Sequence, residues 1–185
     1  MKMVNFIDRY ILSEGTDVDE TQDNFNLYNI CRRKLWKLWN GWQESHGDYV
    51  VSWIERYITK IVKGYEKYYK NKEKIIVLDI GCSAGLYHNK LKDVIEKASG
   101  KECYIIGLDA RYEDLKGIKR KGINNIAKFI SGDAYKLPFK GSSIDFIFSS
   151  FCIEIHIPFK HLYSEIKRII GREPELPMDE NVYFT

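Results

Sequence analysis

The spacing of apolar residues changes once along the chain, near Lys74. Before that point, apolar side chains recur every three or four residues, which is the period of an amphipathic helix. The pattern predicts two helices, at 23–42 and 48–69, and residues 1–74 are interpreted as an N-terminal helical cap. Acidic residues between Asp17 and Asp23 favour the start of the first helix, because negative charge stabilises a helix N-terminus.

After Lys74, short apolar runs alternate with stretches of helical period. The runs lie at 75–79, 103–109, 127–131 and 144–149, with a last short one at 181–185, and runs of this kind are typical of buried strands. The helical stretches lie at 86–99, 113–120 and 160–170. Strands that alternate with helices predict an α/β fold, a doubly wound parallel sheet of about five strands with helices on both faces.

Composition supports a folded chain without a membrane segment. Of the 185 residues, 44% are hydrophobic and 30% charged, close to the globular average, which excludes collagen-like and wholly disordered classes. No apolar stretch reaches the about 18 residues that span a bilayer, and the N-terminus lacks a signal-peptide core. The cysteines form no C-x-x-C pair, which argues against a zinc knot or a disulfide framework. We therefore expect a cytoplasmic protein that binds neither membrane nor metal.

Candidate ligand-binding residues follow three of the predicted strands, at the edge where parallel sheets bind ligands. The first strand leads into Asp79-Ile-Gly-Cys-Ser-Ala-Gly85, a turn of small residues that a ligand can approach closely. Asp109 ends the second strand, where an acid accepts hydrogen bonds from ribose hydroxyls. Asp133 follows the third strand, directly after Gly132. Each feature alone is commonly structural, but the three together favour a ligand that contains a nucleoside.

These segments resemble the motifs of class I S-adenosylmethionine-dependent methyltransferases. Residues 76–85 resemble the first motif, 106–109 the acid of the second strand, and 132–139 the GDAxxLPF segment; 142–150 and 153–170 resemble the fourth strand and the stretch after it. The resemblance covers about residues 75–170 and implies a Rossmann-like core, S-adenosylmethionine as the cofactor, and the small-molecule and quinone-type branch. A dinucleotide is the rival ligand, but Ser83 stands where its fingerprint has a second glycine.

The resemblance also implies roles for single residues. Gly81, Ser83 and Gly85 would let the methionine moiety lie on the turn, and Asp79 would bond to nearby backbone or to the ligand amino group. The full set of cofactor-binding residues it implies is Asp79, Gly81, Cys82, Ser83, Gly85, Asp109, Ala110, Asp133, Ala134 and Ser150.

Four of these residues would hold the rest of the cofactor. Asp109 would bind the ribose hydroxyls. Asp133 would accept a hydrogen bond from the adenine amino group, and the Ala134 amide would donate one to a ring nitrogen. Ser150 would face the methionine amino group from the end of the fourth strand.

No catalytic residue is obligatory, because methyl transfer depends mainly on orienting the acceptor. A hydroxyl acceptor would need a general base, for which His156 or Glu154 is suitable, although a loop histidine without chemistry is the simpler interpretation of His156. His46 and His88 lie in no recognisable pattern. The spacing of His156 and His161 argues against a metal site.

Two regions outside the motifs concern partners. Arg32, Arg33, Lys34 and Lys37 lie among tryptophans, which suggests nucleic-acid contacts, but we favour a helical cap packed over the cofactor or acceptor site. The core, 75–185, is expected to lack the last two strands of the family. Its final strand would then have an open edge that a second copy or a partner chain could cover, or it would be a frayed terminus.

Two functional hypotheses follow. The first is an enzyme that methylates a small molecule. The second is a non-catalytic S-adenosylmethionine-binding module, or one piece of a split methyltransferase that acts with a partner chain.

Overall fold

A computed structural model describes residues 49–83, 85–110, 127–153, 157–174 and 182–185. Five strands form one sheet in the order β3-β2-β1-β4-β5. Their bounds are β1 Lys74–Ile80, β2 Glu102–Asp109, β3 Ala127–Ser131, β4 Phe146–Ser150 and β5 Val182–Phe184. The helical elements are η1 Ile54–Ile58, a turn of π-helix, then α3 Thr59–Gly64, α4 Glu66–Tyr69, α5 His88–Ser99 and α7 Phe159–Ile170.

The first four strands are parallel, which confirms the predicted doubly wound α/β sheet. The fifth strand differs from the prediction, because β5 runs antiparallel to β4. Val182 pairs with Ser150 and Phe184 with Phe148, so the chain enters β5 at the carboxyl end of β4. The apolar run at 181–185 predicts a strand but carries no information on its direction.

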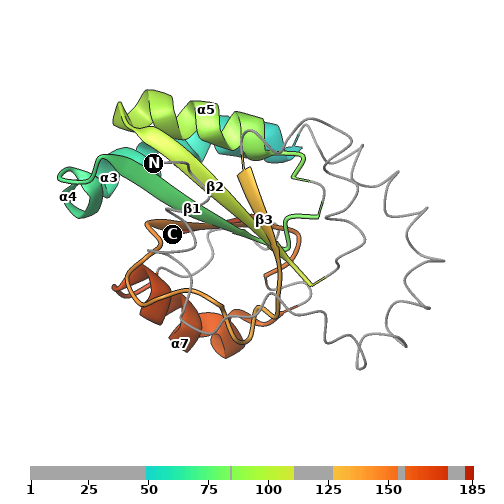
Figure 1. Ribbon diagram of the computed structural model, residues 1–185. Helices are drawn as coiled ribbons and strands as arrows, with labels where there is room; N and C mark the ends of the chain where they lie inside the picture. The colour runs from blue at the N-terminus through green and yellow to red at the C-terminus, as the bar shows by residue number, and fades with distance from the viewer. Residues whose placement is uncertain (1–48, 84, 111–126, 154–156, 175–181) are drawn as a thin grey trace.

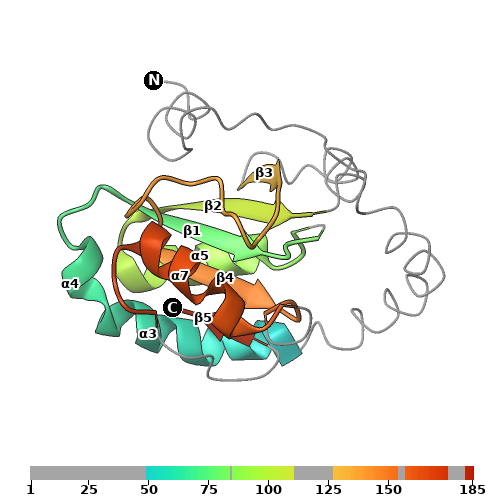
Figure 2. The same cartoon turned by 90° about the horizontal axis from the view of Figure 1, so that it is seen from below.

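Helices cover both faces of the sheet, as predicted (Figure 1). Alternate residues of β1 point to opposite faces, which is the period of a strand. Ile76, Leu78 and Ile80 share a buried cluster with the inward face of α7. Ile75 and Val77 share the other cluster with α5 and with the helices before β1. Figure 2 shows the same layers from the side of α7.

The helical region before β1 packs against a face of the sheet. Trp53, Ile58 and Val62 are buried in the same cluster as β1, β2 and α5. The apolar stripe on residues 50–69 is therefore buried on the face of the sheet that α5 also covers. The position expected for the helix at 23–42, over the cofactor or acceptor site, stays a prediction. The first predicted cap helix, at 23–42, and the predicted helix at 113–120 lie outside the described residues.

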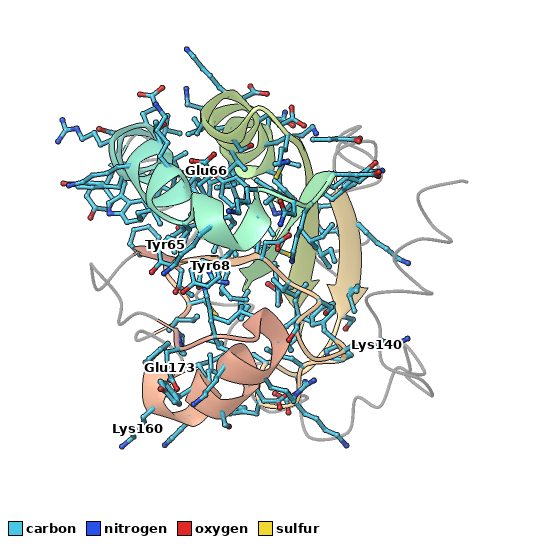
Figure 3. The ribbon with its side chains drawn as sticks, turned by 90° about the vertical axis from the view of Figure 1, so that its left-hand side faces the viewer. Tyr65, Glu66, Tyr68, Lys140, Lys160 and Glu173 are labelled. Atoms are coloured by element: carbon cyan, nitrogen blue, oxygen red, sulfur yellow. The ribbon has the colours of Figure 1, made fainter. Side chains whose placement is uncertain are left out.

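An arginine after α7 joins the two sides of the molecule. The Arg172 guanidinium lies 5.0 Å from the ring centres of both Tyr65 and Tyr68 and 5.6 Å from that of Phe146. Its Nη1 donates a hydrogen bond to the Asp145 carbonyl at 2.8 Å. Figure 3 shows the two tyrosines on the side of α4 that faces the end of α7. Cation–π contacts of this kind fix the helices before β1 against the start of β4.

Among the described residues, no helix is both long and apolar enough to cross a bilayer.

Candidate functional site

The carboxyl ends of β1, β2 and β3 are fastened together by backbone hydrogen bonds. The amides of Gly81 and Cys82, just after β1, donate to the carbonyl of Leu108 in β2 at 2.8 and 3.1 Å. The Gly132 amide, just after β3, donates to the carbonyl of Asp109 at 3.1 Å. The structure therefore brings together the three motifs that the sequence places after separate strands.

The turn after β1 needs small residues for reasons of backbone conformation and space. Gly81 and Gly85 have φ values of +76° and +66°, and Ser83 has +47°, all in the left-handed region that side chains disfavour. A Cβ on Gly81 would lie 2.5 Å from the Cβ and Sγ of Cys152. The turn therefore has no room for a larger residue at Gly81, and its backbone lies close to the residues after β4.

Asp109 supports this turn directly. Its Oδ2 accepts a hydrogen bond from the Ser83 amide at 2.9 Å, and only 7% of the residue is exposed. Ala110, the next residue, is exposed. The acid predicted to bind ribose thus also holds the turn predicted to bind the methionine moiety, a link that strand-by-strand reasoning does not show.

The carboxylate of Asp79 is hydrogen-bonded to His88, a residue outside the predicted site. Oδ2 of Asp79 lies 2.8 Å from Nε2 of His88, the first residue of α5, and the two residues are 3% and 0% exposed. The imidazole also stacks on Phe129 of β3, with ring centres 5.3 Å apart. Burial raises the pKa of Asp79, and the charge of Asp109 raises it further, while the hydrogen bond and charge of His88 oppose the rise.

No signal of period or motif distinguishes His88 in the sequence. It lies nine positions after Asp79, and only the fold of the turn returns the start of α5 to the end of β1.

The segment after β3 is held by α7. Asp133 is exposed, and its Oδ1 accepts a hydrogen bond from the Tyr135 amide at 2.8 Å, which stabilises a local turn. Ala134 is buried. Further along, Oε2 of Glu165 accepts from the Leu137 amide at 2.8 Å.

A second α7 side chain completes this attachment. The guanidinium of Arg168 donates to the carbonyls of Leu137 and Phe139 at 2.9 and 2.6 Å and also pairs with Glu165. The Leu-Pro-Phe part of the segment is therefore fixed to the helix, and Asp133 lies at its free end beside β2.

The end of β4 closes the site on the opposite side of β1. Ser149 Oγ donates to the Ile80 carbonyl at 2.9 Å and is buried. Ser150 is half-buried, and its hydroxyl oxygen is buried without a hydrogen-bond partner among the described residues. Burial and the charge of Asp79 raise the pKa of Tyr87, which keeps its hydroxyl protonated at neutral pH.

The proposed general bases are not placed by the structure. Glu154 and His156 lie outside the described residues, so their role stays a prediction. His161 is exposed on α7 and its ring lies 6.2 Å from that of Tyr135. Across the described ranges, no group of three or more His, Cys, Asp or Glu side chains has the arrangement of a metal site.

Comparison with known proteins identifies a family to which this chain is similar. Residues 78–173 match the family model of a methyltransferase domain. The chain is 31% identical over 132 residues to the uncharacterized protein MJ1252 of Methanocaldococcus jannaschii, which covers 63% of this chain and 47% of that protein. A sterol 24-C-methyltransferase of Gibberella zeae is 29% identical over 99 residues, 51% of this chain and 24% of its own length. The chain thus spans less than half the length of these curated relatives.

Solved structures include similar chains. A SAM-dependent methyltransferase from Aquifex aeolicus superposes with a TM-score of 0.44 and 21% sequence identity, covering 68% of this chain and 67% of its own.

Proposed function

Because this chain belongs to the methyltransferase domain family, we propose that its sheet edge binds S-adenosylmethionine and that the protein transfers the cofactor's methyl group to a small molecule. The hydrogen bond from the Ser83 amide to Asp109 carries the proposal. It joins the turn that would accommodate the methionine moiety to the acid that would bind the ribose, so one ligand can contact both.

The residues present fit this cofactor. The turn leaves its backbone open to a ligand only because it carries no side chains at its glycines. A Cβ would lie 2.5 Å from the nearest side-chain atom at Gly81 and 2.8 Å at Gly85. The buried acids Asp79 and Asp109 lie at the ends of adjacent strands and interact through their charges. A cationic ligand lowers the cost of two negative charges in a partly desolvated site, because Coulomb interactions are stronger there than in water.

The adenine end would be bound by the segment after β3. Asp133 is exposed and adjoins the end of β2 through the bond of Gly132 to Asp109. Its Oδ1 already accepts the Tyr135 amide, which orients the carboxylate and leaves a second oxygen for an amino group. The attachment of this segment to α7 keeps the carboxylate in place without a ligand.

When bound, the cofactor supplies an electrophilic methyl group on a positively charged sulfur. The protein then has to hold an acceptor in line with that methyl group and to exclude water, and orientation alone supplies a large part of the rate enhancement. A hydroxyl acceptor also needs a base, for which Glu154 and His156 are the proposed residues.

Two experiments test the proposal. Calorimetry with S-adenosylhomocysteine should show binding in the micromolar range, and NAD⁺ at the same concentration should give no heat. The absence of heat with S-adenosylhomocysteine would refute cofactor binding.

Incubation with methyl-labelled S-adenosylmethionine and a metabolite extract tests transfer. Label in a low-molecular-weight product supports the small-molecule acceptor, whereas label in an RNA pool offered separately would contradict it. Binding without label in either pool would favour the non-catalytic module.

A further inference from the structure

We propose that His88 is a positioning residue of the cofactor site, which holds the Asp79 carboxylate in its ligand-binding state through the Nε2–H···Oδ2 hydrogen bond. The inference rests on the proposed function, since it assigns a task to a residue beside the proposed methionine subsite. It starts from an observation independent of any ligand, a fully buried imidazole bonded to a buried carboxylate at 2.8 Å.

The hydrogen-bond pattern determines which ring nitrogen carries the proton. Nε2 of His88 faces Asp79, whereas Nδ1 is buried with no hydrogen-bond partner among the described residues. A proton on Nδ1 would be a buried donor without an acceptor, which is costly. The neutral imidazole with its proton on Nε2 avoids this cost, and it leaves Asp79 as the ionised acceptor.

Packing prevents the ring from turning away from Asp79. Phe129 stacks on the imidazole with an interplanar angle of 23°. On the Nδ1 side the ring is in close contact with Gly85, where an added Cβ would be 2.8 Å from Nδ1 and 3.0 Å from Cζ of Phe129. The ring is therefore enclosed between β3, the glycine turn and β1, and its position is coupled to that of the turn.

The charges around the pair explain why Asp79 needs a donor. Asp109 of β2 is the second carboxylate that acts on Asp79, and the neighbouring hydroxyl of Tyr87 stays neutral at the working pH. The groups that act on Asp79 within the described residues include no lysine or arginine. Without His88, burial and the charge of Asp109 would both favour protonation of Asp79, and a protonated Asp79 attracts the ammonium group of the ligand less.

The amides of glutamine and asparagine provide a matched pair of variants. In His88→Gln, the amide nitrogen is the same number of bonds from Cβ as Nε2, so it can donate to Asp79. In His88→Asn, the amide is one methylene shorter and replaces only the Nδ1 end of the ring. Phe129→Leu is the packing control, because it removes the stacked ring and keeps the hydrogen bond.

The measurement is the affinity for S-adenosylhomocysteine, by calorimetry from pH 6 to pH 8.5, with thermal unfolding recorded for each variant. We expect His88→Gln to stay within about threefold of the wild type at every pH. His88→Asn should bind at least about tenfold more weakly at pH 6, and the loss should become smaller toward pH 8.5, because a higher pH favours the ionised form of Asp79. Phe129→Leu should show no such pH dependence.

Each other outcome has a defined meaning. Equal affinity of His88→Asn and the wild type at all pH values would overturn the positioning role and leave the proposed function intact. A pH-independent loss shared by His88→Asn and Phe129→Leu would also overturn it, since packing alone would then explain the effect.

A spectroscopic measurement without ligand separates this inference from the proposed function. Long-range ¹H–¹⁵N NMR of the wild-type imidazole should show the neutral Nε2–H form, and Asp79→Asn should shift the Nε2 resonance. A proton on Nδ1, or an imidazolium at pH 7, would overturn the assignment whether or not the cofactor binds. A wild type with the expected tautomer and no affinity for S-adenosylhomocysteine would refute both the proposed function and the positioning role.

Discussion

Asp109 provides the sharpest test of the site, because its two tasks can be separated by two substitutions. Asp109→Ala removes the acceptor of the Ser83 amide and the proposed acceptor of the ribose hydroxyls. Asp109→Asn keeps a side-chain oxygen for the Ser83 amide but removes the charge. The exposed Asp93 of α5 is the control, as Asp93→Asn makes the same change away from the sheet edge.

The size of each effect follows from the geometry. The bond at 2.9 Å goes to a carboxylate that is 7% exposed, and hydrogen bonds to charged groups contribute about 1.5–3 kcal/mol to stability. Loss of the Asp109 charge also relieves its repulsion of Asp79, which offsets part of that amount. We therefore expect Asp109→Ala to lower the free energy of unfolding by about 1–2 kcal/mol, or the Tm by about 2–8 °C.

Binding should separate the two variants from the control. Asp109→Ala should weaken the binding of S-adenosylhomocysteine by about 1–3 kcal/mol, which is a loss of affinity of roughly 5- to 150-fold. Asp109→Asn should retain most of the wild-type Tm and still bind about fivefold more weakly, because a neutral acceptor makes a weaker hydrogen bond. Calorimetry and thermal unfolding on the same samples measure both quantities.

Two results would refute this reasoning. If Asp109→Ala binds S-adenosylhomocysteine as tightly as the wild type, Asp109 does not contact the ligand. If Asp109→Asn is as unstable as Asp109→Ala, the hydrogen bond to the turn is not the source of the stability.

Three further predictions concern the frame around the site. Gly81→Ala should destabilise the fold by about 1–3 kcal/mol, because φ is positive at this residue and the added Cβ would lie 2.5 Å from Cys152. In denaturant unfolding, a second substitution Cys152→Gly should restore part of the stability, whereas Cys152→Ser should not. Asp145→Ala should cost about 1–3 kcal/mol in the same assay, because it leaves the buried amide of Ile76, now bonded to Asp145 at 2.8 Å, without an acceptor. A loss below about 0.5 kcal/mol, the usual scatter of surface substitutions, would contradict this. The hydrogen bond from Arg168 lowers the pKa of Glu165, so the stability contributed by Glu165 is present at neutral pH and lost as the pH falls through the lowered pKa. Glu165→Gln should lower the Tm at pH 7, and the difference from the wild type should become smaller as the pH falls; a difference that stays constant with pH would contradict this.

Most of the strands and helices, and the positions of the motifs, could be predicted from the order of the amino acids. Buried parallel strands require continuous apolar runs, and those at 75–79 and 103–109 lie within β1 and β2. The turn after β1 can be recognised from Gly81 and Gly85, because few residues other than glycine adopt the positive φ that both have. The alternation of runs and helices predicted that the first four strands are parallel, because a helical crossover returns the chain to the same end of the sheet. The order of the strands was not predicted.

Which of these residues contact one another depends on the folded chain. Three features depend on contacts between segments that are separate in sequence or lie across a turn. They are the direction of β5, the packing of residues 50–69 on the sheet, and the hydrogen bond between Asp79 and His88. The periodicity of a segment indicates which of its faces is buried, but it does not indicate which other element that face packs against. A histidine at a helix start therefore has no recognisable pattern until the fold brings a buried carboxylate within 2.8 Å of its ring.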